Sequence, residues 1–585
     1  MDRPAKRQRV ADFSQGDVVE SPTAGHASLA SLHRAVTPPP KSRPRQLSPS
    51  TTPCTSDVET ARVSGISDGQ KPGFPKREPR ILRSPFQLTH IRDFPPSSGN
   101  NVDTIRLRDI LGDPMIRECW QFNYCFDVDF VMSQFDEDVR DIVKVKIVHG
   151  SWKKDSPTRI AIDEACARYP NAESMTAYMP EPFGTHHSKM MVLLRHDDLA
   201  QVVIHTANMI PGDWANMSQA VWRSPLLRLA PVTTPTMREP PAFGSGERFK
   251  RDLLAYLDFY GSKKTGPLVT QLKKHDFSSV RATLIASVPS REKLCSADSK
   301  KSTIWGWPAL KDTIRQIPLN DAGTDVEPHI VVQISSIATL GQTNKWLKDA
   351  LFSSLSPPPS LSPATTSARP KFSIVFPTPD EIRRSLNGYA SGGSIHIKLQ
   401  SAAQQRQLQY LHPFFCHWAG DRDEIATGIT RSTIPSMRVP GAGLDKKEAG
   451  RRRAAPHIKT YIRFSDKSRM DQIDWAMLTS ANLSTQAWGA VPNANGEVRI
   501  CSWEIGVIVW PQLISGNGEA EMIPCFKKDI PDPVSTSEVN FPAVGLRMPY
   551  DLPLTPYNTH DVPWSATTVH LEPDWLGQTW QGYSS

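Results

Sequence analysis

The chain has 585 residues, more than a single hydrophobic core usually supports, so two domains are expected. Its net charge of +8 is uneven, because residues 1–80 hold 13 Lys or Arg against 8 Asp or Glu and the rest is nearly neutral. The eight cysteines form no CxxC pair and no long apolar stretch occurs, which argues against a structural zinc site, a disulfide framework, secretion and membrane spanning.

Residues 1–83 are rich in Ser, Thr and Pro and lack periodic apolar positions, so a disordered basic tail is predicted. Within it, residues 4–10 (PAKRQRV) resemble a nuclear-import signal, which predicts a nuclear location; a basic tail without that role is the alternative. Thr37, Ser48 and Thr52 each precede a proline, as proline-directed phosphorylation sites do.

The folded part is predicted to begin near residues 84–86. The run 122–130 (FNYCFDVDF) is apolar enough to enter a core. Residues 143–149 (VKVKIVH) are predicted to form a strand, because β-branched residues dominate them.

Two further strands are predicted over residues 189–194 and 202–206, and the charged turn between them is typical of an antiparallel pair. His187 and Lys189 are two residues apart, so on an extended chain they face the same way. The returning strand would bring Asn208 beside them.

A domain boundary is predicted near residues 281–287, which divides the folded chain into residues 84–283 and 284–585. Two low-complexity segments, near 353–370 and 436–455, are expected to be flexible surface insertions of the second domain.

The second half repeats the construction of the first. Strand-like runs over residues 457–464 and 475–479 lead to Asn482, as the earlier pair leads to its asparagine. The repeated residues are His187, Lys189 and Asn208, then His457, Lys459 and Asn482, and each set is followed by a tryptophan, Trp214 or Trp488. One His-x-Lys carries little weight, but two copies with matching asparagines predict two half-sites.

A pair of His-Lys-Asn sets suits the displacement chemistry of a phosphate diester. The lysines neutralise the nonbridging oxygens, and the amides donate hydrogen bonds to them. One neutral imidazole attacks phosphorus, and the other, protonated, donates its proton to the leaving oxygen. Two close imidazoles titrate as a coupled pair, so one charged and one neutral ring are expected near neutral pH. No cofactor and no metal ion are expected.

Other basic residues near the motifs have simpler explanations. His186, His205 and His412 are expected to pack or to support neighbours. The run Arg451–Arg453 comes just before His457, so either a solvated charge run or a substrate contact is possible.

At these residues the sequence resembles the phospholipase D superfamily and, within it, the tyrosyl-DNA phosphodiesterase family. The resemblance covers roughly residues 85–585. Its runs are 121–130 (QFNYCFDVDF), 182–192 (PFGTHHSKMMV), 203–211 (VIHTANMIP), 456–464 (PHIKTYIRF), 479–491 (TSANLSTQAWGAV) and 503–507 (WEIGV). Ordinary superfamily members carry an Asp five residues after the Lys. Here Leu194 and Phe464 stand at those positions, which is the departure that characterises the tyrosyl-DNA branch.

The resemblance implies an α/β fold of two related phospholipase D-like domains. Each would be a mixed sheet flanked by helices, an α-β-α sandwich, with the active site at the domain interface. It also implies a metal-independent enzyme that frees DNA 3′ ends, single-stranded or nicked, from a topoisomerase I peptide.

The resemblance implies a role for each motif residue. His187 would be the nucleophile that forms a covalent phosphohistidine, and His457 the acid and then the base. Lys189, Lys459, Asn208 and Asn482 would hold the phosphate oxygens. Gln219 and Glu504 match groups that orient the two imidazoles, but the sequence leaves open which histidine each one orients.

DNA contacts are implied at three further residues. Phe183 matches an aromatic that stacks on a base, with a buried core Phe as the alternative. Ser335 and Ser336 match residues that bond a backbone phosphate, with a structural role equally open. Thr485 stands where related enzymes commonly place a Lys, and the Arg451–Arg453 run could compensate.

Two other functions remain as alternatives. A lipid-directed phospholipase D is disfavoured by the two missing Asp residues and by the lack of a membrane-targeting segment. A catalytically silent DNA-end-binding protein is disfavoured because both complete motif sets are present. Since one chain carries both half-sites, a monomer would suffice. No membrane partner is expected.

Overall fold

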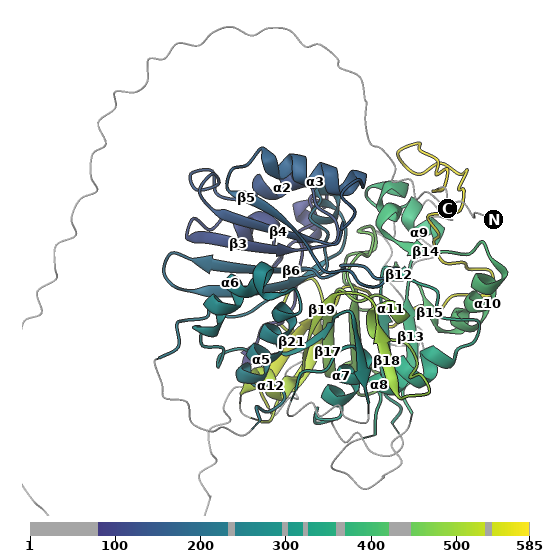
Figure 1. Ribbon diagram of the computed structural model, residues 1–585. Helices are drawn as coiled ribbons and strands as arrows, with labels where there is room; N and C mark the ends of the chain where they lie inside the picture. The colour runs from purple at the N-terminus through teal and green to yellow at the C-terminus, as the bar shows by residue number, and fades with distance from the viewer. Residues whose placement is uncertain are drawn as a thin grey trace, which may run out of the picture. The chain divides into compact units, whose positions relative to one another are not determined.

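The computed structural model describes residues 80–231, 240–294, 302–319, 326–358, 369–419, 446–516, 518–532 and 541–583. Residues 78–585 form one compact unit (Figure 1). Nearly all of the predicted tail and about half of each predicted insertion lie outside the described residues. No helix in the described parts has the length and apolar character needed to cross a membrane.

The described residues contain two large sheets, and the first is built from the motif strands of the first half. Its order is β2 (Gln87–Leu88), β8 (Ala220–Arg223), β7 (Ala200–His205), β6 (Met190–Arg195), β3 (Ile116–Phe122), β4 (Lys144–His149) and β5 (Ala172–Thr176). β3, β4 and β5 run parallel, whereas β6, β7 and β8 are joined antiparallel. The sheet is therefore mixed, as expected.

The second large sheet contains the motif strands of the second half. Its path is β1 (Ile81–Leu82), β21 (Ala543–Arg547), β20 (Glu521–Cys525), β17 (Ile473–Thr479), β16 (Thr460–Phe464), β11 (His329–Gln333), β13 (Lys371–Val375) and β15 (Phe415–Cys416). β19 (Glu504–Val509) pairs with β17 and with β9 (Thr283–Ser287). Two short ladders join β10 (Ser290–Lys293) to β18 (Glu497–Ile500) and β12 (Ser336–Ile337) to β14 (His396–Ile397).

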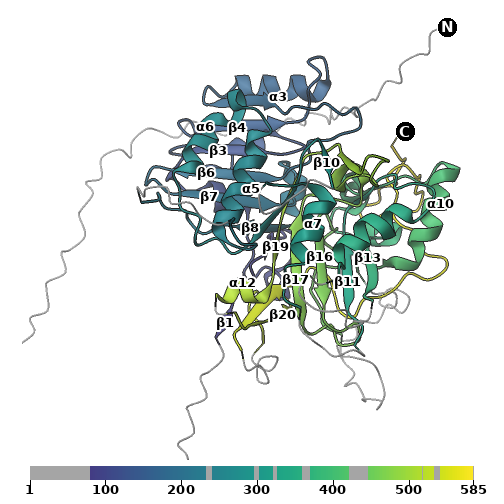
Figure 2. The same cartoon turned by 60° about the horizontal axis from the view of Figure 1, so that its bottom comes forward.

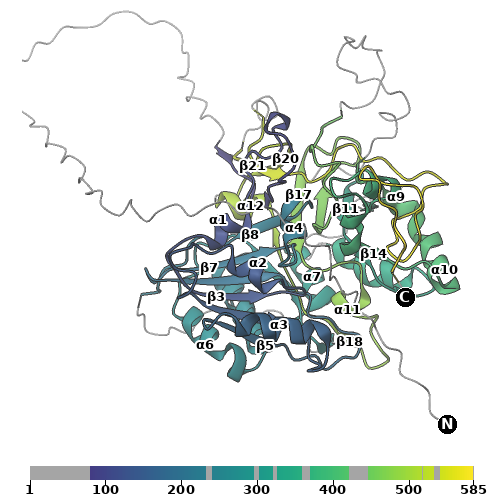
Figure 3. The ribbon, with the colours of Figure 1, turned by 90° about the horizontal axis from the view of Figure 1, so that it is seen from above.

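Helices lie along both faces of the first sheet (Figure 2, Figure 3). Along β6, Met190 and Val192 belong to the same apolar cluster as Leu253 of α5 (Gly246–Asp258). Met191 and Leu193 belong to a second cluster with residues of α2 (Val128–Met132) and α3 (Pro157–Ala167). Burying such a side chain contributes about 1.5–3 kcal/mol, so a strand buried on both faces strongly favours this layering. The predicted α-β-α arrangement is confirmed for this sheet.

The remaining bounds complete the description. The helices of the described residues are α1 (Leu107–Leu111), α2 (Val128–Met132), α3 (Pro157–Ala167), α4 (Pro211–Ala215), α5 (Gly246–Asp258), α6 (Ser262–Lys273), α7 (Gly306–Ile314), α8 (Ser353–Leu355), α9 (Pro379–Arg383), α10 (Ala402–Leu411), α11 (Thr485–Trp488) and α12 (Pro511–Ser515), with the short helical segments η1 (Pro96–Ser98), η2 (Leu347–Phe352), η3 (Gly388–Ser394) and η4 (His412–Phe414).

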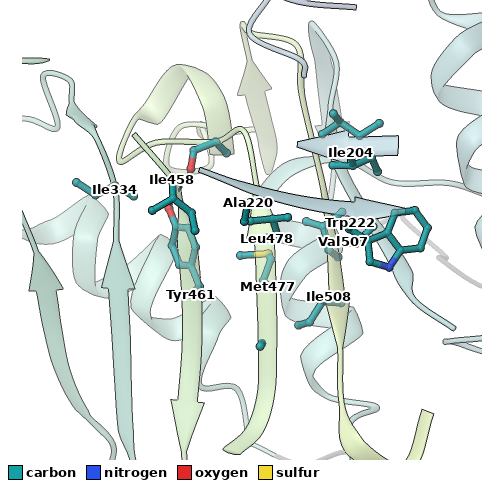
Figure 4. Packing of buried hydrophobic residues seen from close by; sticks show 14 of the residues in the cluster. Ile204, Ala220, Trp222, Ile334, Ile458, Tyr461, Met477, Leu478, Val507 and Ile508 are labelled. Carbon is teal, nitrogen blue, oxygen red and sulfur yellow. Dashed lines mark hydrogen bonds between the residues drawn. The ribbon is translucent and has the colours of Figure 1, made fainter. Parts of the chain in front are cut away.

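The two sheets share one apolar cluster where β7 and β8 approach β17 and β19. Figure 4 shows Ile204 and Trp222 of the first sheet near Leu478 and Val507 of the second. The packing of these buried side chains fixes the ends of the motif strands relative to each other.

Most strand predictions are confirmed, and two details are corrected. The run 122–130 enters a core as predicted, since Phe122 and Val128 are buried; within it Asp127 caps α2 by accepting a bond from the Phe130 amide at 2.9 Å. Ile81–Leu82, placed in the tail by sequence, instead pairs with β21. The predicted insertion at 353–370 begins in ordered chain, since Ser353–Leu355 is helical.

Candidate active site

The two motif hairpins have matching constructions. β6 pairs with β7 and β16 pairs with β17, both antiparallel. Each histidine and lysine precede the first strand of a pair, and each asparagine follows the second. Trp214 Nε1 donates to the Asn208 carbonyl at 3.0 Å, and Trp488 Nε1 donates to the Asn482 carbonyl at 3.1 Å. The repeated tryptophans therefore fix the backbone at the two asparagines.

The two half-sites exchange backbone bonds across the junction of the sheets. The His187 amide donates to the Trp503 carbonyl at 2.9 Å, next to Glu504. In the reverse direction, the His457 amide donates to the Ser218 carbonyl at 3.1 Å, next to Gln219. Each imidazole is thus brought beside a side chain from the other half of the chain.

His187 is oriented by a carboxylate. Its Nδ1 lies 3.0 Å from Glu504 Oε2, the same oxygen that accepts a bond from Ser480 Oγ at 2.5 Å. Since Nδ1 is engaged, Nε2 is the ring atom left for chemistry. The carboxylate fixes the tautomer with the proton on Nδ1 and increases the basicity of Nε2.

His457 has a different pair of neighbours. Its Nδ1 lies 3.0 Å from Gln219 Nε2, 3.3 Å from Gln219 Oε1 and 3.2 Å from Asp213 Oδ2. Thr206 Oγ1 donates to Gln219 Oε1 at 2.7 Å, which holds the amide in place. The structure thereby pairs Glu504 with His187, and Gln219 with His457.

Asp213 was missed by the sequence analysis. It is buried in α4, and besides contacting His457 its Oδ2 accepts a bond from the Asn208 amide at 2.7 Å. The available signal is the spacing before the tryptophan: Asp213 precedes Trp214, whereas Ala487 precedes Trp488 at the equivalent place. The half-sites therefore differ at this position.

The motif lysines are buried behind the histidines. Lys189 Nζ donates to the His187 carbonyl at 3.4 Å, and Lys459 Nζ donates to the His457 carbonyl. Burial lowers the pKa of Lys189 to about 8 and holds the pKa of Lys459 well below its usual value. A bound phosphate would reverse this effect, because an anion stabilises the charged amines.

The histidine charge states differ from the sequence-based expectation. Burial, and then the positive charges of Lys459 and Lys189, hold the pKa of His457 well below 6.5. Burial also lowers the pKa of His187, although Glu504 opposes it. In the free protein both rings are therefore neutral near pH 7, instead of one charged and one neutral. Burial also raises the pKa of the Asp213 carboxyl.

The two motif imidazoles line the same cavity, which has a volume of about 630 Å³. His187, Asn208, His457 and Asn482 line it. Phe183 also lines it with 78% of its surface exposed, so the alternative of a buried core Phe is wrong.

Ser335 and Ser336 serve the second asparagine. Their amides donate to Asn482 Oδ1 at 3.1 and 3.0 Å, and Ser335 Oγ lies 3.3 Å from the same oxygen. This leaves the NH₂ of Asn482 as the donor toward the cavity. Ser335 is buried, whereas Ser336 is partly exposed and both border the cavity.

The basic run before His457 is not a flexible charged loop. Arg451 is fully buried, and its guanidinium donates to the Thr89 carbonyl at 2.8 Å and approaches the Asn100 carbonyl at 3.4 Å. Arg452 pairs with Asp551 at 2.7 Å. Neither explanation considered from sequence holds for Arg451, because the side chain ties together distant segments of the fold.

The other histidines have structural surroundings. His186 is buried between the Asn123 carbonyl, 3.0 Å from Nδ1, and the Tyr260 hydroxyl, 2.9 Å from Nε2. His205 is buried against Trp214, with ring centroids 5.7 Å apart. His412 Nε2 lies 3.0 Å from the Asp561 carbonyl.

Comparisons with known proteins agree with this geometry. Residues 85–558 match the family model described as tyrosyl-DNA phosphodiesterase. The chain is 29% identical to the probable tyrosyl-DNA phosphodiesterase of Schizosaccharomyces pombe, covering 86% of this chain and 96% of that one. It is 27% identical to tyrosyl-DNA phosphodiesterase 1 of Drosophila melanogaster, covering 84% and 75%.

The fold is also similar to a solved structure. The crystal structure of the yeast tyrosyl-DNA phosphodiesterase matches with a TM-score of 0.54 and 21% identity, covering 83% of this chain and 99% of that chain. Two mixed-sheet halves that share a site with paired His-Lys-Asn sets define a phosphodiesterase of the phospholipase D superfamily. Within that class, the chain belongs to the tyrosyl-DNA phosphodiesterase family, whose members are DNA-repair hydrolases.

Proposed function

We propose that this protein hydrolyses the bond between a tyrosine of a topoisomerase I peptide and a DNA 3′ phosphate, and removes other 3′ adducts at the same site. The observation that carries the proposal is the exchange of partners between the half-sites: Glu504 on His187, and Gln219 with Asp213 on His457. Two imidazoles with unlike partners on one cavity suit two unlike roles.

In the first step His187 Nε2 attacks phosphorus, and the bond from phosphorus to the tyrosyl oxygen breaks. His457 Nε2 gives its proton to that oxygen, so tyrosine leaves neutral and the DNA remains linked as a 3′-phosphohistidine. Glu504 stabilises the positive charge that develops on His187. His457 gains its proton when the anionic substrate binds, because the phosphate offsets the nearby lysine charges that hold its pKa low.

In the second step water attacks the phosphohistidine. His457, now neutral, takes a proton from the water, and the bond from phosphorus to His187 breaks to leave a 3′ phosphate. Proton transfer of this kind contributes about 10²- to 10⁴-fold to the rate. Lys189, Lys459, Asn208 and Asn482 hold the nonbridging oxygens through both steps, so no metal ion is needed.

The DNA strand lies along the cavity wall. Phe183 offers an exposed ring on which a base can stack regardless of sequence, and Ser336 offers a hydroxyl to a backbone phosphate. The substrate is a single-stranded or nicked 3′ end. A single chain supplies both half-sites, so the active form is a monomer, which light scattering would test.

The protein acts in the nucleus, where the basic residues of segment 4–10 direct it. A fluorescent fusion of the full chain should accumulate there. Replacement of Lys6, Arg7 and Arg9 by Ala should disperse it, and unchanged accumulation would contradict this assignment.

The activity is tested with an oligonucleotide that ends in 3′-phosphotyrosine, in the presence of EDTA. Cleavage to a 3′ phosphate is expected. Cleavage only after a divalent metal is added, or choline release from phosphatidylcholine in place of DNA cleavage, would overturn the proposal.

A further inference from the structure

One lysine borders the cavity without belonging to either motif. Lys398 directly follows β14, and it is the one lysine among the described residues that line the cavity. β14 pairs in parallel with β12, with Ser336 opposite His396 (Figure 1). The His396 amide donates to the Ser335 carbonyl at 2.9 Å. Because Ser335 in turn binds Asn482, Lys398 stands on the same support as a motif asparagine.

The cavity lining next to this lysine contains the apolar Ile337 and Ile397 and several uncharged polar groups. Gln404 and Gln407 of α10 border the cavity on this side, and Ser484 and Gln486 border it beyond Asn482. Thr485 does not line the cavity; its hydroxyl donates to Gln486 Oε1 at 3.1 Å. The position where a lysine would be expected therefore supplies no cation to the wall.

Lys398 is available for an anionic ligand. Its side chain is exposed, and it forms no ion pair with any residue in the described ranges. Burial lowers the pKa of His396, and the charges of Lys459, His187 and Lys398 lower it further. The charge of Lys398 therefore acts on a residue that lines the cavity. A cation on a flexible stem next to neutral donors suits a sequence-independent contact with a phosphate.

We propose that Lys398 binds a nonbridging phosphate oxygen of the DNA strand on the 5′ side of the scissile bond, and so supplies the substrate contact that Thr485 does not. This inference rests on the proposed DNA 3′-end activity. The contact sets affinity for the strand, whereas the chemical step depends on the motif residues.

The test compares Lys398→Gln, Lys398→Arg and the control Lys263→Gln on an oligonucleotide that carries a 3′-(4-nitrophenyl) phosphate, over a salt series. Lys263 is an exposed residue of α6 outside the cavity lining. Lys398→Gln should raise KM roughly three- to tenfold at low salt, leave kcat unchanged, and reduce the slope of log KM against log salt by about 0.7. Lys398→Arg should retain the wild-type slope.

A second substrate locates the contact. Thymidine 3′-(4-nitrophenyl phosphate) has no upstream phosphate for Lys398 to bind. On this substrate Lys398→Gln should have the same KM and kcat as wild type. The inference is overturned if the salt slope does not change, if Lys263→Gln changes it equally, or if the defect persists on the single nucleotide. Failure of the wild-type protein to cleave either substrate would instead refute the proposed function.

Discussion

At the scale of single residues, the site is built from similar sets that differ in their supports. Glu504 places a carboxylate on His187, whereas His457 contacts the neutral amide of Gln219 and the buried carboxyl of Asp213. In the proposed mechanism these contacts favour His187 as the nucleophile and His457 as the group that moves protons.

Replacing His457 by Asn should separate the two steps. Attack by His187 should continue, more slowly on a tyrosyl substrate than on a 3′-(4-nitrophenyl) one because the acid is lost. The phosphohistidine also lacks the base that activates water, so a covalent protein–DNA species should accumulate and be visible on denaturing gels. His187→Ala and the double variant should form no adduct. An adduct that survives in the double variant, or continued turnover of His187→Ala, would refute or reverse the assignment.

Asp213 is predicted to act through His457. In Asp213→Asn the side chain can no longer exchange a proton with His457, but it can still accept the bond from the Asn208 backbone amide. We therefore expect kcat to fall about 10- to 100-fold with little change in KM. In single-turnover assays the loss should be smaller for a 3′-(4-nitrophenyl) substrate than for a tyrosyl substrate, because the first leaves as 4-nitrophenolate and needs no proton. Equal losses on both substrates would show that the residue acts only structurally.

At the scale of elements, the loop before β6 is held at close range against the segment that precedes β19. The Thr185 carbonyl accepts the Trp503 amide at 2.8 Å, and a Cβ added at Gly184 would lie 2.1 Å from the Cys501 carbonyl oxygen. The absence of a side chain at Gly184 is what lets His187 reach Glu504.

Gly184→Ala should therefore displace the His187 loop. A shift near 1 Å can lower the rate by about 100-fold, so a loss of tenfold or more is expected while far-UV circular dichroism stays unchanged. The control is Gly212→Ala at the start of α4, where an added Cβ meets nothing within 4 Å. Full activity in Gly184→Ala would mean that the close approach does not position His187.

At the scale of the whole molecule, two histidines next to the motif strands of the first half are buried and held neutral. Burial lowers the pKa of His186 and of His205 to about 3. The His205 ring is fully buried and packs against Trp214. The fold therefore excludes protons that the unfolded chain would bind.

This exclusion makes stability depend on pH. Below about pH 6.5 the unfolded chain protonates His205 and the folded chain does not, so its contribution to stability is lost progressively as the pH falls toward the folded-state value. His205→Gln removes this titration. Between about pH 6.5 and 4.5, wild type should lose about 2 kcal/mol more unfolding free energy than the variant in urea melts. Parallel losses would contradict a neutral His205.

Local patterns accounted for much of the fold. The runs that became β4, β6, β7, β16 and β17 were predictable because each is rich in apolar residues and contains a β-branched one, as strands that are largely buried in a sheet require. The six motif residues were identifiable because the spacing from His to Lys to Asn is set within a single hairpin.

Contacts between distant segments were decided only by the tertiary structure. The sequence could not assign Glu504 and Gln219 to their histidines, since that depends on how two sheets pack across more than 200 residues of chain. Arg451 looked like a solvated or substrate-binding charge because the carbonyls that bind it are more than 300 residues away. The sequence by itself determined the chemistry of each half-site, and the packing of the sheets decided which groups orient each imidazole.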